Sequence, residues 1–280
     1  MLQIILMHSS KMLKKRLIFT LLFDRGHFVL SRNFRLQKVG DLLWLKNNYD
    51  FSKISFFIDE LIVLDVSRGV RNRDLFVNTL SKIATGCFAP IAAGGGIENL
   101  EDARRVLRSG ADKVVLNSAL SSNLTLVRKI AEEFGQQCII GSLDLKRTVQ
   151  GEYCIYTHNG GHKQAVGLTD FLDSQAVSSV GEIYLNSIDR DGTGQGYDFN
   201  MLNFVPDSCA LPLILAGGAG NSRHLLEGLQ YPRVDAVATA HLFNFVGDGL
   251  KKARGVLLDS GVKLAYWPDI STLNLKKEYH

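Results

Sequence analysis

Asp144 is the residue of this sequence best suited to acid–base chemistry, because it ends the apolar run CIIGSLDLKR. Burial raises the pKa of such a carboxyl group and makes it a candidate general acid or base. The alternative is a structural partner for Lys146 or Arg147. The similar run RLIFTLLFDR, which begins at Arg16, has Leu22 at the matching position. The sequence therefore predicts one acid/base group where two copies of a motif could supply two.

Two glycine-rich stretches, AGGGIENLEDA from Ala93 and AGGAGNSRHLL from Ala216, each read as a strand, a glycine turn and a helix start. Backbone N–H groups at such a turn can approach an anion, and the helix N-terminus adds positive potential. One turn is weak evidence, since glycine turns after strands are common for steric reasons. Two at equivalent positions predict two phosphates and a two-ended phosphorylated substrate. The residues expected to bind are Gly95, Gly96, Asn117, Ser118, Gly217 and Gly218.

Polar residues also follow other apolar runs. In SIDRDGTGQG, Asp191, Gly192 and Thr193 could bind a phosphate or a sugar hydroxyl, or could simply form an Asp-Gly turn. Asp65 ends the run ELIVLD and is a further substrate-binding candidate. His241 could contact an anion or could be structural, and both interpretations stay open.

An internal repeat connects these motifs. ELIVLDVSRG resembles EIYLNSIDRD, PIAAGGGI resembles PLILAGGAG, and ADKVVLNSAL resembles VDAVATAHLF, in the same order. Glu60 to Gly94 spans 34 residues, and Glu182 to Gly217 spans 35. The boundary between the two halves falls near Gly135.

The repeat predicts the fold. Each apolar run suits a strand buried on both faces, and helical patterns cover residues 100–111, 123–135 and 222–230. Four strand–helix units in each half predict an α/β fold, a (β/α)8 TIM barrel of two duplicated half-barrels, with a doubly wound open sheet as the alternative. We expect one barrel over residues 12–268, half-barrels at about 12–135 and 136–268, and terminal extensions at 1–11 and 269–280.

In such a barrel the chemistry lies at the C-terminal ends of the strands. The polar residues expected to face this mouth are Asp65, Asn117, Asp144, Ser187, Asp189 and Asp191.

Composition excludes several classes of function. The 280 residues carry a net charge of +4, too mild and scattered for a nucleic-acid surface. The opening MLQIILMHSSKMLKKR is too short to cross a bilayer, and its charges follow the apolar run, so we expect neither a membrane anchor nor a signal peptide. Met12 is an alternative start. Four cysteines without CxxC spacing indicate a reduced cytoplasmic protein, and no metal cluster or cofactor is implied.

From about Leu13 to Trp267 the chain resembles the HisF family, the cyclase subunits of imidazole glycerol phosphate synthase. The resemblance rests on VLDV, AGGGIENLEDA, ADKVVLNSAL, SLDLKR, EIYLNSIDRDGTGQGYD and LAGGAG, in this order. It implies a half-barrel-duplicated (β/α)8 fold. It also implies a HisH-like glutaminase partner in a heterodimer, from which ammonia travels through the barrel to the substrate.

The resemblance further implies two catalytic aspartates, at the ends of strands 1 and 5. The second matches Asp144, whereas the first falls on Leu22, and a substrate-contacting lysine falls on Leu30. Asp24 lies two residues beyond Leu22, in the expected loop, and would have to reach back to replace the missing acid.

The family's ring of charges at the ammonia entrance is complete in this chain. It matches Arg16, Glu60, Lys113 and Glu182, each at the start of an expected strand. The alternative is a set of salt bridges on an ordinary barrel floor. Retention of all four beside a lost catalytic acid favours an ammonia entrance.

Three functions follow from the resemblance. The first is ammonia conduction for sugar amidation in surface polysaccharide, as in WbuZ-type HisF-like proteins, with a phosphorylated small-molecule or sugar acceptor and a separate ATP-using sugar amidotransferase. The alternative is a cyclase that converts the PRFAR ribonucleotide and ammonia to imidazole glycerol phosphate and AICAR in histidine biosynthesis. It would act without one acid/base group, a loss that typically costs about 10²–10⁴ in rate. The third is a non-catalytic activator of the glutaminase.

Overall fold

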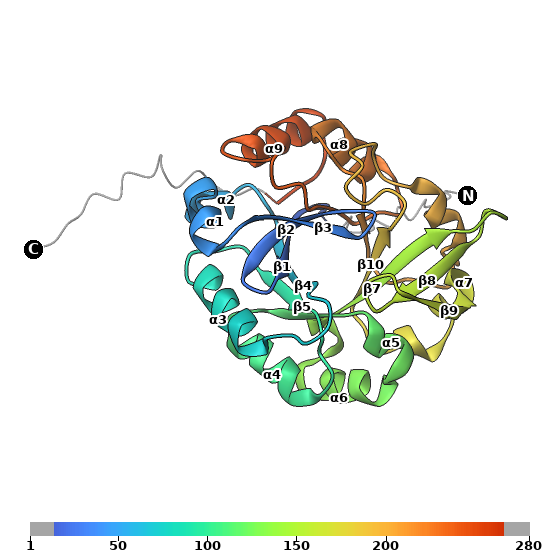
Figure 1. Ribbon diagram of the computed structural model, residues 1–280. Coiled ribbons are helices and arrows are strands. Elements are labelled where there is room, and N and C mark those ends of the chain that lie inside the picture. The colour runs from blue at the N-terminus through green and yellow to red at the C-terminus, as the bar shows by residue number, and fades with distance from the viewer. Residues whose placement is uncertain (1–13, 266–280) are drawn as a thin grey trace, which may run out of the picture.

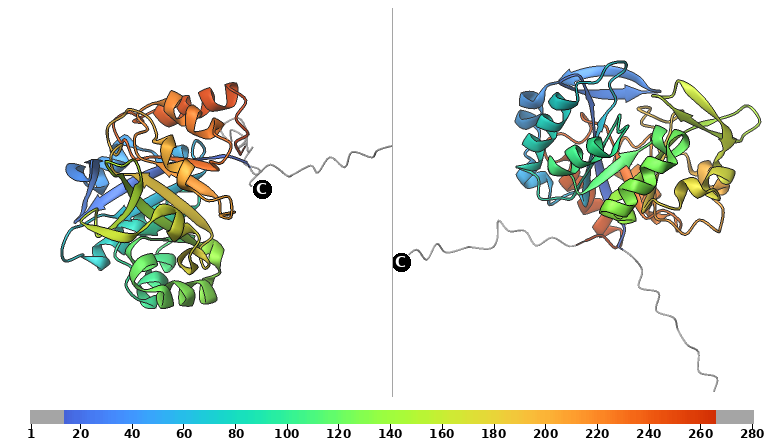
Figure 2. Two further views of the ribbon diagram at one scale, coloured as in Figure 1. Left: turned by 90° about the vertical axis from the view of Figure 1, so that its right-hand side faces the viewer. Right: turned by 90° about the horizontal axis from the view of Figure 1, so that it is seen from below.

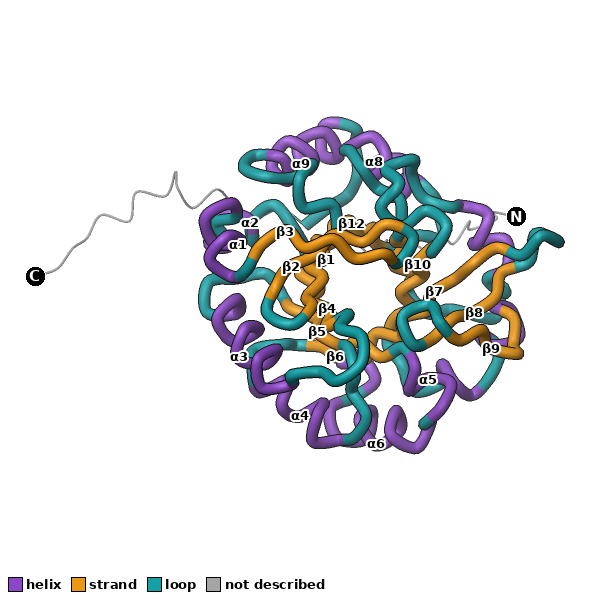
Figure 3. Tube along the Cα trace, in the orientation of Figure 1, coloured by secondary structure: helices purple, strands orange, loops and turns teal. Residues whose placement is uncertain are grey.

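The computed structural model describes residues 14–265. The expected terminal extensions, 1–11 and 269–280, and the alternative start at Met12 lie outside this range. Eight parallel strands close into a barrel, because β12 pairs with β1 and β10 pairs with β7 (Figures 1 and 3). The predicted (β/α)8 barrel is confirmed, and the open-sheet alternative is wrong. The barrel strands are β1 (Arg16–Asp24), β4 (Glu60–Asp65), β5 (Ile91–Gly94), β6 (Lys113–Leu116), β7 (Ile139–Arg147), β10 (Glu182–Ser187), β11 (Leu213–Ala216) and β12 (Ala236–Thr239).

Helices surround the barrel on its outside (Figures 1 and 2). They are α1 (Leu42–Asn48), α2 (Phe51–Ile54), α3 (Arg73–Ala84), α4 (Leu100–Arg108), α5 (Ser118–Ser122), α6 (Leu124–Phe134), α7 (Leu168–Leu172), α8 (Ser222–Gln230) and α9 (Gly249–Asp259), with short 3₁₀ segments η1 (Gln136–Cys138), η2 (Gln175–Val177) and η3 (Phe199–Phe204). The prediction for α8 matches the structure. Helix α4 ends three residues early, since Gly110 takes a φ of 100°. Helix α6 lies between its N-cap Asn123 and Gly135, at φ 88°.

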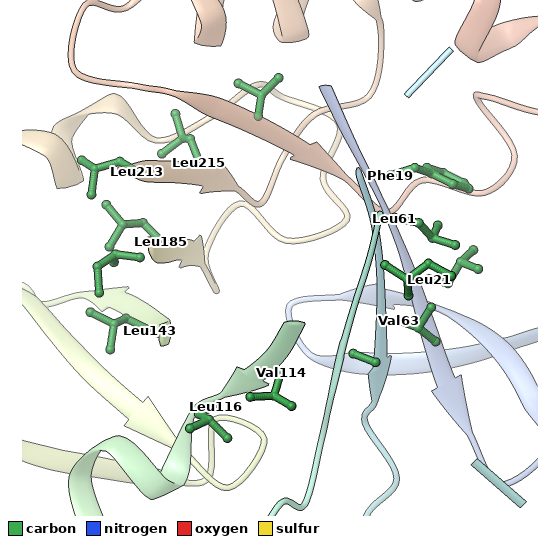
Figure 4. Close-up of a cluster of buried hydrophobic side chains, with 14 of the residues drawn as sticks. Phe19, Leu21, Leu61, Val63, Val114, Leu116, Leu143, Leu185, Leu213 and Leu215 are labelled. Atoms are coloured by element: carbon green, nitrogen blue, oxygen red, sulfur yellow. The ribbon is translucent and has the colours of Figure 1, made fainter. Parts of the chain in front are cut away.

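Side chains alternate between the two faces of each strand, and this alternation makes two apolar layers. The outward-facing layer packs under the helices and includes Phe19, Leu61, Leu143 and Leu185 (Figure 4). The inward-facing layer fills the barrel and consists of Ile18, Ile62, Ala92, Val115, Ile140, Tyr184, Ile214, Ala216, Ala236 and Ala238. Both layers are buried, so the strands read as continuous apolar runs rather than as alternating patterns.

The strand registers define how the two halves correspond. Leu61 pairs with Ile91 in the first half, and Ile183 pairs with Leu213 in the second. Ile183 lies 122 positions after Leu61, and Leu213 lies 122 positions after Ile91. This offset also relates Leu22 to Asp144. By the same offset, the residue equivalent to Gly94 is Ala216 and not Gly217, so the alignment of the two glycine-rich stretches from the sequence was wrong by one residue. The equivalent glycines are Gly95 with Gly217 and Gly96 with Gly218.

Each half also carries an antiparallel hairpin that the sequence analysis did not predict. Strands β2 (His27–Arg32) and β3 (Arg35–Gly40) follow β1, while β8 (Tyr153–Thr157) and β9 (His162–Gly167) follow β7. The first hairpin turns at Asn33 and Phe34, with φ of 48° and 63°. Two positive φ values in a two-residue turn suit the right-handed twist of a hairpin. This hairpin runs across the front of the barrel towards β10 (Figures 1 and 3).

Helix α9 is tied to the first strands by a buried ion pair. The Arg254 guanidinium donates to both oxygens of Asp59, at 2.9 and 3.0 Å, and both side chains are at most 6% exposed. Asp59 also accepts from the backbone N–H of Leu17 at 2.8 Å. The last described helix is thereby fixed to the strand that begins the barrel. None of the helices that the structure describes is long and apolar enough to cross a membrane.

Candidate functional site at the barrel mouth

A cavity of about 770 Å³, here called the mouth cavity, opens at the C-terminal ends of the strands. Its size is typical of a small-molecule site. Most of the residues selected from the sequence line it. They are Leu22, Leu30, Asp65, Gly95, Gly96, Asn117, Ser118, Asp144, Asp191, Gly192, Gly217, Gly218 and His241.

Asp144 lies in the wall of this cavity and is held by two amide side chains. Its Oδ1 accepts from Asn186 Nδ2 at 2.9 Å, and its Oδ2 accepts from Asn117 Nδ2 at 3.1 Å. Burial raises the pKa of Asp144 to about 7, and the Asp191 carboxylate adds to this rise, while the two amide donors oppose it. A carboxyl group that titrates near neutral pH can both give and take a proton, which suits general acid–base catalysis.

The opposite wall of the cavity carries a strip of leucines. Leu22 of β1 is paired with Leu64 of β4, and Asp144 of β7 is paired with Asn186 of β10. The 122-position offset makes these two pairs equivalent in the two halves. The first half therefore lacks the supporting amide as well as the acid. Leu30 and Leu36 extend this wall. These leucines form an apolar strip in the first half's share of the lining, which also includes polar residues such as Asp65, Arg68 and Arg71.

Asp24 does not restore the missing acid. The structure corrects its expected position, because Asp24 is the last residue of β1 rather than part of a loop. Its carboxylate accepts from Arg25 Nε at 3.0 Å, and Asp24 is not among the residues that line the mouth cavity. Burial would raise the pKa of Asp24, but its hydrogen bond and ion pair with Arg25 outweigh burial and lower it.

The first glycine turn, Gly95–Gly96, has the backbone that an anion site requires. Both residues have positive φ, at 109° and 68°. A Cβ on Gly95 would collide with the carbonyl oxygen of Asp65, so only glycine can occupy this position. Among residues 14–265, no group accepts a hydrogen bond from the backbone N–H of Gly96 or Ile97. These donors remain available at the edge of the cavity.

The second glycine turn, Gly217–Gly218, repeats this geometry, with φ of 88° and 103°. A Cβ on Gly217 would lie 2.6 Å from the carbonyl oxygen of Ser187, the counterpart of Asp65. Within the described part of the chain, the backbone N–H groups of Gly218 and Ala219 also have no acceptor. The mouth cavity therefore has two sets of backbone donors, one from each half.

Asn117 and Ser118 lie beside the first glycine turn but are partly engaged within the protein. Asn117 Nδ2 donates to Asp144 and, at 3.1 Å, to the carbonyl oxygen of Ser142. Ser118 Oγ accepts from the backbone N–H of His158 at 3.4 Å. Asn117 thus holds the acid in place, whereas the sequence suggested phosphate binding.

Asp191 and Thr193 act within the protein's own loops. Asp191 Oδ2 accepts from the hydroxyl of Ser31 and, at 3.0 Å, from the backbone N–H of Phe34, so this carboxylate anchors the tip of the β2–β3 hairpin. Thr193 does not line the mouth cavity, and its hydroxyl donates to the carbonyl oxygen of Arg190 at 2.8 Å. The Asp-Gly turn considered for this loop describes Thr193 better than ligand binding does.

Two other residues expected at the mouth, Ser187 and Asp189, do not line the cavity. Ser187 is fully buried. Asp189 accepts from the backbone N–H of Arg147 at 2.9 Å and lies outside the cavity lining. His241 lines the cavity, and its Nδ1 accepts from the backbone N–H of Asn244 at 3.3 Å. Burial lowers the pKa of His241, so the neutral form that can accept this bond is favoured.

At the other end of the barrel, Arg16, Glu60, Lys113 and Glu182 form a closed charge ring. Arg16 pairs with Glu60 at 2.9 Å and with Glu182, while Lys113 pairs with Glu60 at 3.1 Å and with Glu182 at 2.6 Å. Two cations and two anions alternate, so the ring carries no net charge. Burial raises the pKa of Glu60. Burial would also raise the pKa of Glu182, but its contacts with Arg16 and Lys113 together outweigh burial and lower the pKa.

The inward-facing apolar layer separates the charge ring from the mouth cavity. Tyr184 belongs to this layer and also lines the cavity, together with Thr20 and Val115. Burial raises the pKa of the Tyr184 phenol, which therefore stays neutral. Along the barrel, paired charges, an apolar layer and the mouth cavity with Asp144 thus follow one another.

Sequence reasoning missed several residues of the mouth. Asn186 could have been found, since the repeat relates it to Leu64. Arg68, Arg71 and His158 also line the cavity, but their loops show no pattern that marks them in advance.

A closed barrel of two related halves, with a charge ring at one end and two glycine turns at the other, defines the HisF-like class of (β/α)8 proteins. The chain belongs to the histidine biosynthesis protein family, whose model matches residues 37–247. A protein of Parasynechococcus marenigrum (strain WH8102), provisionally named imidazole glycerol phosphate synthase subunit hisF2, is 44% identical over 270 residues. The match covers 96% of this chain and all of that relative, so the resemblance to the HisF family is confirmed.

Proposed function

We propose that this chain is the barrel subunit of a glutamine amidotransferase complex, which conducts ammonia from a HisH-like glutaminase to an acceptor in the mouth cavity. One contrast carries the proposal: the charge ring is complete, but the acid/base pair at the mouth is not. Arg16, Glu60, Lys113 and Glu182 form four ion pairs, whereas Leu22 and Leu64 stand where the second half has Asp144 and Asn186.

The acceptor in this proposal is a sugar that is amidated for surface polysaccharide, as in WbuZ-type proteins. The apolar wall of Leu22, Leu30 and Leu64 argues against a reaction that needs charged groups on both sides of the substrate. The two glycine turns support a phosphorylated small molecule or sugar. An ATP-using sugar amidotransferase would complete the reaction, and the predicted cytoplasmic location belongs to the same proposal.

The alternative is the cyclase reaction of histidine biosynthesis, and Asp144 is the observation that favours it. A pKa of about 7 suits this residue for proton transfer. One aspartate would then do the work of two. A second alternative, activation of the glutaminase without conduction, would make no use of the charge ring.

The first test supplies the purified chain with the PRFAR ribonucleotide and concentrated ammonium salt at alkaline pH, and follows substrate loss. We expect no turnover, because the apolar wall offers no partner for Asp144. Turnover that Asp144→Asn abolishes would overturn the proposal in favour of the cyclase.

Conduction and activation are separated by a coupling measurement in the complex with glutaminase, sugar amidotransferase and acceptor. We expect Arg16→Ala to lower the ratio of amidated sugar formed to glutamine hydrolysed, because an open ring lets ammonia escape. Arg223→Met, which removes an exposed charge paired with Glu227, is the matched control. An unchanged ratio in Arg16→Ala would support the activator instead.

A further inference from the structure

Arg71 lines the mouth cavity, and its side chain donates no hydrogen bond to any of residues 14–265. Its side chain is only 23% exposed, and its Nε is buried without a hydrogen-bond partner among the described residues. The Asp65 carboxylate with which it pairs lies 3.9 Å from Nε, too far for a hydrogen bond. A guanidinium has five N–H donors and stays charged at all physiological pH values. Holding one here without an acceptor is costly, unless a ligand supplies the acceptor.

The position of Arg71 associates it with the first glycine turn. A Cβ on Gly96 would lie 2.7 Å from Cδ of Arg71 and 3.0 Å from its Nε, so the guanidinium packs directly on this turn. The free backbone donors of Gly96 and Ile97 lie at the same turn. Arg71, Gly96 and Ile97 all line the mouth cavity.

The neighbouring arginines differ from Arg71 because their guanidinium groups are engaged. Arg68 donates to the carbonyl oxygen of Phe34. Arg73 contacts Asp102 and Glu98, both at 2.8 Å. Charge in this loop is therefore not in itself unusual. Arg71 differs in that its guanidinium, which donates no hydrogen bond, lies beside the backbone N–H groups of Gly96 and Ile97, which also have no acceptor among the described residues.

We propose that Arg71 completes a phosphate subsite at the first glycine turn and binds a phosphate monoester group of the acceptor. The planar guanidinium can donate two parallel hydrogen bonds to phosphate oxygens, while the turn supplies backbone N–H groups. This inference builds on the acceptor of the proposed function. It also supplies a cation at a mouth where Leu30 replaces the lysine that the family resemblance implies.

The two glycine turns are consequently unequal. Arg68 and Arg71 line the mouth cavity from the first half. Arg190, which packs on Gly218 of the second turn, does not line the cavity and donates to Gln195 Oε1 at 3.4 Å. The first turn should hold a phosphate dianion more tightly than the second. A two-ended acceptor would therefore bind in a single orientation, with its more charged end at Arg71.

The test uses inorganic phosphate as the probe and the full chain, isotopically labelled, with NMR of the backbone N–H groups. In the wild type we expect Gly96 and Ile97 to respond at lower phosphate concentrations than Gly218 and Ala219. In Arg71→Gln, affinity at the first turn should fall about tenfold or more, as expected for loss of hydrogen bonds to a charged group. Affinity at the second turn should stay unchanged.

Arg73→Gln is the matched control. It removes the same charge two positions further along the chain, from an arginine whose guanidinium already contacts Glu98 and Asp102. If both substitutions weakened phosphate binding at the first turn equally, the subsite would be overturned, because Arg71 would then contribute only its charge and no specific hydrogen bonds. Equal affinities of the two turns in the wild type would overturn it without any variant. If Arg71 only neutralises Asp65, Arg71→Gln would lower stability and leave phosphate affinity unchanged. None of these measurements involves ammonia or a glutaminase, so their failure would leave ammonia conduction untouched.

Discussion

At the scale of single residues, Asp144 depends on neighbours from both adjacent strands. Asn117 follows β6 and Asn186 belongs to β10, and each donates to one oxygen of the carboxylate. The amides fix the direction of the carboxylate, while burial decides its charge. The first half keeps the strand geometry but places Leu22 and Leu64 at these positions.

The raised pKa of Asp144 makes stability depend on pH. Burial shifts the pKa from 3.8 to about 7, so the folded protein keeps a proton that the unfolded chain loses. The free energy of unfolding of the wild type should therefore fall relative to Asp144→Asn as pH rises from about 4 to about 7. The fall should be at most about 4 kcal/mol, at 1.36 kcal/mol per pKa unit, with no further change above pH 7. Urea unfolding of both proteins at several pH values measures it, and parallel curves would contradict the raised pKa.

The sequence predicts these residues unevenly. Asp144, Leu22 and the glycines could be found because the repeat places equivalent residues at a fixed offset. Arg71 could not, since the role of a loop side chain depends on which groups the folded chain leaves beside it. The contacts of Asp191 with the β2–β3 hairpin could not be predicted for a similar reason, since they join loops that are far apart in the sequence.

At the scale of elements, the β2–β3 hairpin is fixed across the mouth by the loop after β10. Asp191 accepts from Ser31 and Phe34, and Asn33 Nδ2 donates to the carbonyl oxygens of Ile188 and Asp189, both at 3.1 Å. The sequence did not reveal the hairpin, because its turn residues, Asn33 and Phe34, are not the Asn-Gly pair that usually marks such a turn.

Asp191→Ala should loosen this hairpin, because two donors lose their acceptor. Arg32 and Arg35 are exposed on either side of the turn, so trypsin should cut there several times faster in the variant. Limited proteolysis with mass spectrometry measures this. Asp189→Ala removes a nearby carboxylate that contacts the β7 backbone and should leave the cleavage rate unchanged. Similar rates in Asp191→Ala and the wild type would show that other contacts hold the hairpin.

At the scale of the whole molecule, barrel closure brings the two ends of the described chain together. Strand β12 pairs with β1, and Arg254 of α9 reaches Asp59, which begins the approach to β4. The sequence predicted the closed barrel through its repeat. It did not predict this ion pair, because the partners lie 195 positions apart and neither belongs to a repeated motif.

Arg254→Met should cost about 3–5 kcal/mol of stability, since it leaves the buried Asp59 carboxylate without its partner. Urea unfolding at neutral pH measures this cost. Arg223→Met breaks an exposed i,i+4 pair and should cost about 0.5 kcal/mol or less. The double variant Asp59→Asn, Arg254→Met should recover part of the loss. A cost as small as that of Arg223→Met would show that the buried pair does not hold α9 in place.

The charge ring has a consequence for timing. Lys113 contacts both Glu60 and Glu182 and is only 20% exposed, so any movement of this side chain breaks two contacts at once. A cost of about 3 kcal/mol, the order found for breaking buried ion pairs, keeps the ring open for about one part in 150 of the time. In the proposed function, ammonia would therefore pass only during these brief openings, and the rate of passage would depend on how often the Lys113 side chain leaves the ring.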